Sequence, residues 1–222
     1  VYKRQVFSGI DEPEAEPESN DGQSMKEMWA LVKGDRDLQK FLVVRSLMLV
    51  TALSTPFIVV MAGDEGADLT GLGAFIIASG GASLLGGRVS GKFSDRSSKS
   101  TMAWAAGVAS TVLVALVASA RLAPSAVNAW VMPLGFFLVN LAHTAVRVSR
   151  KTYLVDMADG DKRTMITGAS NTVMGVVLLV VGAVSSAIAV LGPQAALIFL
   201  AVVGYAGVVG ARNLKEVSAA AS

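Results

Sequence analysis

"LTGLGAFIIASGGASLLGG" (residues 69–87) decides the fold, and it runs directly into "RVSGKFSD" (residues 88–95). The first stretch has no charged side chain and is long enough to cross about 30 Å of hydrocarbon as a helix. Its length and its freedom from charge favour a transmembrane helix over a short buried strand. The charged residues that follow then mark one end of that helix.

The residues from Gly86 to Lys92 nearly match a P-loop, whose pattern is G-x-x-x-x-G-K. That loop needs a Ser or Thr after the lysine to bind Mg²⁺, and a β-strand ahead of its glycines. Here Phe93 follows the lysine and a long apolar segment precedes the glycines. A phosphate-binding loop is therefore not expected.

The composition is that of a membrane protein. Hydrophobic residues make up 53% of the chain, charged residues 16%, and the mean hydropathy is +0.56. Soluble domains carry roughly a quarter charged residues. With no cysteine and one histidine, neither a disulfide framework nor a zinc site is expected, and no cofactor or metal is predicted.

The chain divides into three parts. Residues 1–38 are acidic, and a Pro- and Glu-rich run from Ser8 to Gly22 predicts a disordered cytoplasmic linker. Ser24 and Glu27 then form a capping-box pattern, which predicts a short amphipathic helix that ends near Gly34. Residues 39–213 form the transmembrane bundle, and residues 214–222 are a cytoplasmic tail. Because the chain begins at Val1 without an apolar leader, we expect a fragment of a longer protein.

Six segments are long and apolar enough to cross the membrane as helices, with short polar connections between them. They cover residues 41–62, 69–87, 102–120, 126–147, 165–191 and 193–211. The expected fold is therefore an all-α, polytopic membrane helix bundle.

The Lys and Arg residues predict the orientation of this bundle. Of 19 in the chain, only Arg121 falls in the first, third or fifth loop. Because cytoplasmic flanks retain positive charge, both termini are expected on the cytoplasmic side of the cell membrane. The basic pI of 9.0 then reflects topology, and no nucleic-acid partner is expected, since the charges sit in separate short loops.

Polar side chains inside spans indicate which helices face a cavity. In span four, Asn140, His143, Thr144 and Arg147 share one helical face. Ser170 and Asn171 of span five lie at a matching depth, so we expect hydrogen bonds between the two helices. Span one offers further polar residues and a proline expected to kink it; these are Arg45, Thr51, Ser54, Thr55 and Pro56. Spans three and six have few polar residues and are expected to face lipid.

The candidate substrate cavity therefore consists of Thr51, Thr55, Asn140 and His143. Each polar residue also has a structural interpretation: Asn140 as a bond between packed helices, His143 as a buried imidazole rather than a carrier of protons or substrate, and Arg45 as a side chain that extends to the lipid headgroups. The glycines at 71, 73, 80, 81, 86 and 87 are expected to permit close helix packing or, as a second choice, to act as a hinge.

One loop resembles a family signature. "GKFSDRSSKS" (residues 91–100) is similar to the G-x-x-x-D-R-x-G-R-K loop of the major facilitator superfamily: Gly91, Asp95 and Arg96 match in register and Lys99 supplies a cation, although Ser98 and Ser100 depart from it. "RVSRKTYLVDMADGDKR" (residues 147–163) resembles the matching later loop, with Asp156 followed by Arg163. The layout resembles the C-terminal six-helix half of such a 12-helix transporter.

The resemblance implies a cytoplasmic gating latch. Asp95 would pair with Arg147 or Arg150 or cap span five, and Asp156 would pair with Arg88 or Arg96. These contacts would favour the outward-facing state. It also implies that helices one and four line the cavity, two and five face the N-terminal half, and three and six lie outside. The alternative is that these charges serve only positive-inside insertion.

The leading functional hypothesis is secondary active transport of a small solute, with efflux as one direction, by alternating access together with an N-terminal six-helix half. No predicted span contains Asp or Glu, so coupling to protons would depend on His143 or on acids in the other half. A non-transporting membrane scaffold or receptor is the alternative. An enzyme is not expected, because the chain lacks G-x-S-x-G and His143 has no evident catalytic partner.

Overall fold

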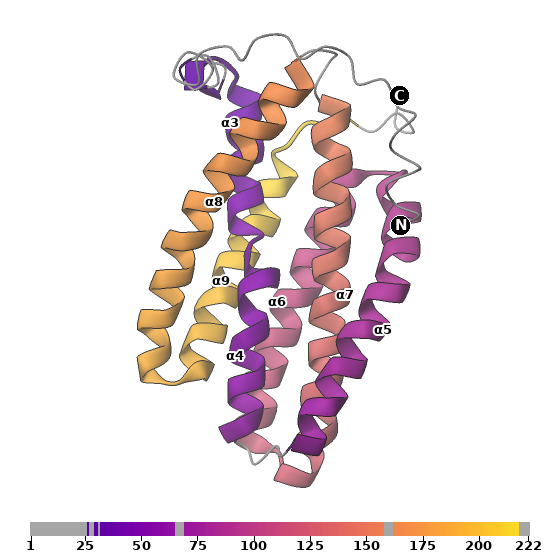
Figure 1. The fold of residues 1–222 in the computed structure, drawn as a ribbon, viewed down its shortest axis with the longest axis vertical. Helices are drawn as coiled ribbons and strands as arrows, with labels where there is room; N and C mark the ends of the chain where they lie inside the picture. The colour runs from indigo at the N-terminus through magenta and orange to yellow at the C-terminus, as the bar shows by residue number, and fades with distance from the viewer. Residues whose placement is uncertain (1–25, 27–28, 31, 65–68, 158–161, 218–222) are drawn as a thin grey trace, which may run out of the picture.

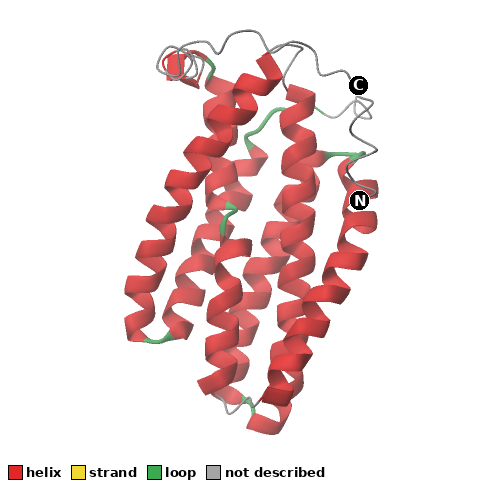
Figure 2. Cartoon of the chain, viewed as in Figure 1, coloured by secondary structure: helices red, strands yellow, loops and turns green. Residues whose placement is uncertain are grey.

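The computed structural model describes residues 26, 29–30, 32–64, 69–157 and 162–217. The described part is helical apart from short turns (Figure 2), which confirms the all-α prediction. The chain is helical at Lys26, Trp29, Ala30 and residues 32–34, and this helix ends before Asp35. The predicted capping residues Ser24 and Glu27 lie outside the described residues.

Six helical segments of the described part are long and apolar enough to span a membrane. Each coincides with one predicted span, so the chain is a multi-pass membrane protein. The helices are α3 (Arg36–Leu47) and α4 (Val50–Asp64), which together form the first span, then α5 (Leu69–Ser94), α6 (Ser98–Leu122), α7 (Ser125–Met157), α8 (Lys162–Ile188) with the 3-10 turn η1 (Ala189–Leu191), and α9 (Pro193–Arg212).

Two helices run farther than the sequence predicts. α5 continues through Gly86–Ser94, so the near P-loop is helical and the connection to α6 shrinks to residues 95–97. α7 likewise continues from residue 147 to Met157. Charged residues are compatible with a helix that leaves the hydrocarbon, so a polar sequence marked the end of the membrane and not the end of the helix.

The first span is discontinuous at Met48 and Leu49, where the α-helical pattern lapses for two residues. The Leu49 N–H bonds to the Ser46 carbonyl at 3.2 Å, which is an i to i−3 bond. The sequence predicts a kink at Pro56, and α4 remains helical through that proline; the lapse at Met48 and Leu49 lies earlier in the span. No Gly or Pro lies near Met48, so local sequence gave no signal. Both break residues are buried, which fits the rule that irregular backbone at membrane depth is covered by protein.

Small residues bring the helices close together. α5 packs mainly on α7, and α6 packs on both α7 and α9. A Cβ added to Gly135 of α7 would lie 2.5 Å from a methyl carbon of Leu116, and one added to Gly86 of α5 would lie 2.8 Å from the Thr144 methyl carbon. These two glycines therefore set helix separations, as small residues commonly do in membranes.

The helices differ in how much of their surface the chain itself covers. Buried residues make up 17% of the most apolar window of α5 and 11% of that of α8, against 39–44% in the other four spans. α6 and α9, which we expected to face lipid, pack closely on each other and keep one exposed apolar face each. A lack of polar side chains therefore did not separate lipid contact from tight packing of small residues.

The glycines of α5 fall into two groups, those that contact α7 and those that have open space around them. Gly86 contacts α7, and an added Cβ on Gly81 would lie 3.5 Å from the ring of Phe137. Around Gly73, Gly80 and Gly87, by contrast, an added Cβ would meet nothing within 4 Å. Close packing within this chain therefore explains only the first two.

Gly86 and its neighbour Gly87 form a matched pair for testing this packing. Gly86→Val is expected to lower the thermal unfolding temperature of the chain in detergent, because overpacking against Thr144 costs about 1–3 kcal/mol. Gly87→Val adds the same side chain to open space and should leave the unfolding temperature nearly unchanged. Equal destabilisation by both variants would contradict the packing of α5 against α7.

Candidate functional site: a polar seam between three spans

Arg45 is the best-buried charged side chain among the described residues. It lies in the last turn of α3 and donates hydrogen bonds to two residues of α8, one to Ser170 Oγ and one to Asn171 Oδ1 at 2.9 Å. The interpretation of Arg45 as a side chain that extends to the headgroups is therefore wrong. Among the described residues, the expected hydrogen bonds between span four and Ser170 or Asn171 are not formed; both side chains accept from the Arg45 guanidinium instead.

A second contact joins α4 to α7, directly beside the break in span one. Thr51 Oγ1 lies 3.1 Å from His143 Nδ1 and 3.2 Å from the Met48 carbonyl oxygen. Thr51 is buried and His143 half-buried. A hydroxyl has one proton to donate, so a Thr51 that donates to Met48 requires Nδ1–H on His143. This pair brings together two of the four predicted cavity residues.

The other two cavity residues lie nearby and are half-buried. Thr55 is one turn beyond Thr51 on α4. Asn140 donates from Nδ2 to the Phe136 carbonyl of its own helix at 2.9 Å. Among the described residues it makes no bond to α8, so Asn140 does not serve as a bond between those helices in this conformation.

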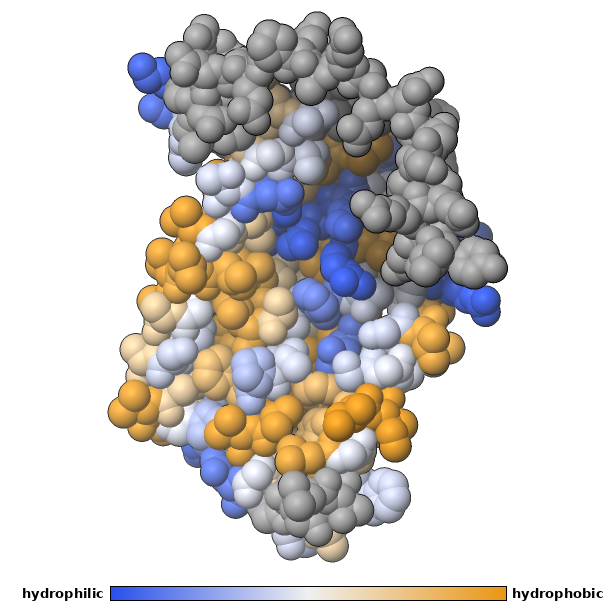
Figure 3. Space-filling model, in the orientation of Figure 1, coloured by the Kyte–Doolittle hydropathy of each residue, from blue (hydrophilic) through white to orange (hydrophobic). Residues whose placement is uncertain are grey.

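Arg150 lies close enough to both contacts for its positive charge to repel positive charge on Arg45 and on His143. Arg147 acts on His143 and on Arg150 as well. We call this group the polar seam; it comprises Arg45, Thr51, Asn140, His143, Arg147, Arg150, Ser170 and Asn171. Figure 3 shows a hydrophilic band between α8 and α7, with hydrophobic surface on either side.

The seam carries an excess of positive charge. Three of its members are arginines, and within the described part of the chain none of the three forms an ion pair with Asp or Glu. The Nε atoms of Arg45 and Arg150 are buried without a hydrogen-bond partner. Arg45 is buried, Arg150 is half-buried and Arg147 is exposed. A buried cation without a carboxylate is costly unless another group compensates it, and this cost falls mainly on Arg45.

The predicted gating residues lie at the basic end of the bundle, which is uppermost in Figure 1. Gly91 is on α5, Asp95 and Arg96 form the exposed turn, and Lys99 is in the first turn of α6. In the described residues Asp95 makes no ion pair with Arg147 or Arg150. The latch at Asp95 is thus not formed in this conformation and stays a prediction.

The second predicted gating pair lies on helices. Asp156 is exposed near the end of α7, and the described residues show no ion pair between it and Arg88 or Arg96. Arg163 is in the first turn of α8, and its side chain is outside the described part. The resemblance implied that Asp156 and Arg163 share one loop. Instead, Asp156 lies in α7, which extends to Met157, and Arg163 lies in α8.

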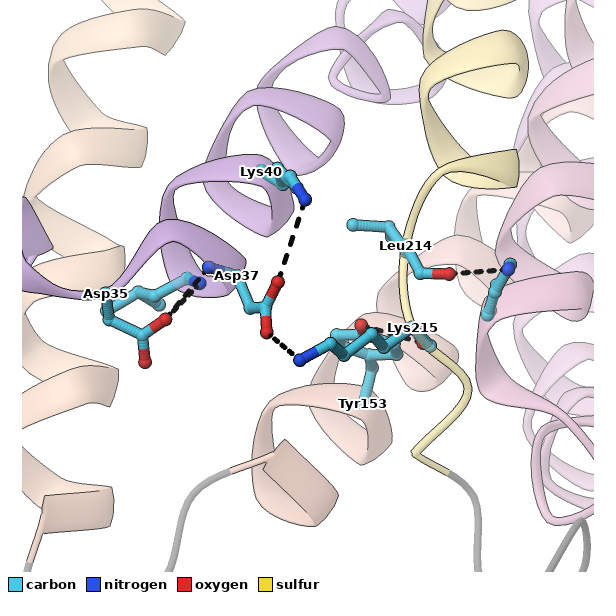
Figure 4. A network of polar contacts seen from close by, with 8 residues as sticks. Asp35, Asp37, Lys40, Tyr153, Leu214 and Lys215 are labelled. Carbon is cyan, nitrogen blue, oxygen red and sulfur yellow. Dashed lines mark hydrogen bonds and ion pairs between the residues drawn. The ribbon is translucent and has the colours of Figure 1, made fainter.

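A different set of contacts joins the helices at the basic end. Residues 213–217, here called the C-terminal strap, cross from α9 toward α3, α6 and α7 (Figure 4). Lys215 Nζ lies 2.5 Å from Asp37 Oδ2, and its carbonyl accepts from the Tyr153 hydroxyl at 3.0 Å. The carboxylate of Asp37 raises the pKa of Lys215, which keeps the amine charged.

The strap also contacts the start of α6. Lys99 Nζ donates to the Leu214 carbonyl at 2.5 Å, and Ser97 Oγ donates to Glu216 Oε2 at 2.7 Å. The Leu214 side chain is buried. Sequence reasoning missed the strap because a short charged tail normally indicates a solvated end; the available signal was the two apolar residues within it, Leu214 and Val217.

These observations establish a membrane bundle with a cationic seam, and they carry no family assignment. No family model matches the chain, and no curated protein matches it either. No group of three or more metal-binding side chains occurs among the residues that the structure describes. The likeness to the major facilitator superfamily therefore rests on the two segments at residues 91–100 and 147–163 and on the helix layout.

The contact between Thr51 and His143 can be tested by NMR, because His143 is the one histidine of the chain. Thr51→Val removes the hydroxyl and should shift the side-chain ¹⁵Nδ1 resonance at fixed pH, since Nδ1 loses its hydrogen-bond partner. Thr51→Ser keeps the hydroxyl and should leave the resonance near its original position. An unchanged resonance in Thr51→Val would rule the contact out.

Packing of the strap can be tested with two leucines. Leu214→Ala should lower the free energy of unfolding by about 2 kcal/mol, the lower end for a buried leucine. Leu122→Ala, at a position that is 85% exposed, should change it by less than about 0.5 kcal/mol. Denaturant unfolding in detergent measures both, and a harmless Leu214→Ala would mean that the strap is not docked in solution.

Proposed function

We propose that this protein is a secondary active transporter that moves a small solute by alternating access, in the manner of a major facilitator superfamily permease. The observation that carries the proposal is the polar seam. Ionisable residues within membrane spans are rare, and they usually mark a pathway for substrates or ions. A break in span one lies beside Thr51, and broken helices commonly form the binding sites of transporters.

A second six-helix half is part of this proposal. The faces of α5 and α8 that this chain leaves uncovered support it, as do Gly73, Gly80 and Gly87, which recur every seven residues along α5 with no neighbour. Small residues on one helical face allow another helix to approach closely. The two halves would then rock against each other around the seam.

The charge of the seam favours an anionic solute. Arg45 is held in place by Ser170 and Asn171, while Arg147 and Arg150 add positive charge toward the basic end. A carboxylate or phosphate on the solute would supply the missing counter-charge, and arginine suits both through paired hydrogen bonds. Proton coupling through His143, or through acids of the other half, belongs to the same proposal.

The alternative function is a membrane scaffold or receptor that transports nothing. In such a protein the seam would serve only to join α3 to α8 and α4 to α7. The bonds from Arg45 to α8 fit that role too, so flux is the property that separates the two functions. We favour transport because a purely structural joint does not require a buried arginine such as Arg45 that lacks an Asp or Glu partner among the described residues.

The proposal is tested by uptake in proteoliposomes that contain the protein expressed from its full reading frame. Radiolabelled mono- and dicarboxylates and phosphate esters serve as probes, with organic cations of similar size for comparison. We expect uptake of at least one anion, and we expect Arg45→Gln to reduce it at least tenfold, about the effect of losing one charge-assisted bond.

Arg121→Gln is the matched control, because Arg121 is exposed at the opposite end of α6 and should leave uptake within twofold. Size-exclusion chromatography shows whether each variant is folded. Uptake of cations alone would refute the anionic solute while leaving transport intact. No flux of any probe, with or without a proton gradient, would favour the scaffold.

A further inference from the structure

Two grooves open on either side of a single ridge at the basic end of α6. The ridge consists of Ser100, Trp104 and Val108, which lie four residues apart and line both grooves. The first groove, of about 550 Å³, runs between α6 and the pair α5 and α7; the second, of about 700 Å³, runs between α6 and α9. Trp104 is 75% exposed on the ridge.

Both grooves are apolar along the helices and cationic where they begin. Side chains such as Phe93, Leu138 and Leu141 line the first groove, and Val208 and Val209 line the second. Arg96 lies on the first groove, and Lys99 and Arg212 lie on the second. Glu216 also lines the second groove, so the three cations exceed the acid by two.

The dimensions match one leaflet of a bilayer. From Lys99 to Val112, both on the second groove, α6 rises by about 20 Å. Half of a hydrocarbon core is about 15 Å, which leaves about 5 Å for a headgroup near the cations. Trp104 lies about 8 Å along α6 from Lys99, a depth typical of interfacial aromatic residues.

We propose that these grooves bind one anionic phospholipid that straddles Trp104, with one acyl chain in each groove and its phosphate near Arg96 and Arg212. Two apolar grooves that share one ridge suit a molecule with two chains, and the excess of positive charge selects an anionic headgroup. Basic pockets between membrane helices are known to bind such headgroups on the cytoplasmic side, which is where the positive-inside pattern places this end. The site is separate from the polar seam and does not depend on transport.

The test uses the fluorescence of Trp104, which lies on the ridge. The sequence has only two other tryptophans to replace. Trp29→Phe with Trp130→Phe leaves Trp104 as the one tryptophan of this sequence, and any tryptophan encoded elsewhere in the full reading frame is also changed to Phe before the protein is reconstituted in vesicles. Phosphatidylglycerol or phosphatidylcholine is added with brominated acyl chains, at equal total composition. We expect the site at Trp104 to bind brominated phosphatidylglycerol about three- to tenfold more tightly than brominated phosphatidylcholine, on the scale of one basic contact.

Two variants assign that preference to the cations. Arg96→Gln with Arg212→Gln should bring the relative affinity close to one, whereas Arg96→Lys with Arg212→Lys should keep it above twofold. Arg121→Gln, at the far end of α6, should leave it unchanged. A reporter with Trp130 alone, 82% exposed on α7, should show no preference between the two lipids.

Three results would overturn the proposal. The first is equal quenching of Trp104 by both lipids, which would indicate ordinary surrounding lipid. The second is a preference that survives Arg96→Gln with Arg212→Gln. The third is no quenching by either lipid, which would mean that a protein surface, such as a second copy of this chain, covers the ridge.

Discussion

The hydrogen bonds that Arg45 donates to Ser170 and Asn171 hold the seam together. α8 is the span that the rest of the chain covers least, so apolar packing does little to place it. A buried guanidinium whose donors lack acceptors is costly, and α8 supplies acceptors for the two terminal nitrogens of Arg45. The position of α8, and with it the width of the seam, therefore depends on a polar contact rather than on a hydrophobic one.

The helices could be predicted from the sequence because hydrocarbon leaves the backbone few choices. Every N–H and C=O in the membrane must be bonded within the protein, and uncharged segments such as residues 69–87 satisfy that rule only as helices. The ends of the helices were harder to predict. The sequence predicts loops after Gly87 and after Arg147, but a helix that leaves the membrane tolerates charged residues, as α5 and α7 do.

The sequence was also insufficient to predict which helices the polar side chains contact inside the membrane. Periodicity placed Asn140 and His143 on one face of span four, and the contact between His143 and Thr51 brings two of the chosen residues together. Which helix Ser170 and Asn171 would face depended on the packing of three helices at once, which a linear pattern does not contain. The break at Met48 and the C-terminal strap are tertiary features of the same kind, since the residues there have no unusual local propensity.

α7 is one helix of 33 residues, about 50 Å long in a hydrocarbon layer of about 30 Å. It is anchored to α4 through His143, while Tyr153 is tied to the strap about 15 Å farther along the axis. A stiff rod that pivots near its middle moves most at its tip. Any small rotation of α7 against α4 is therefore amplified into a larger sideways displacement at the aqueous end, as in a lever.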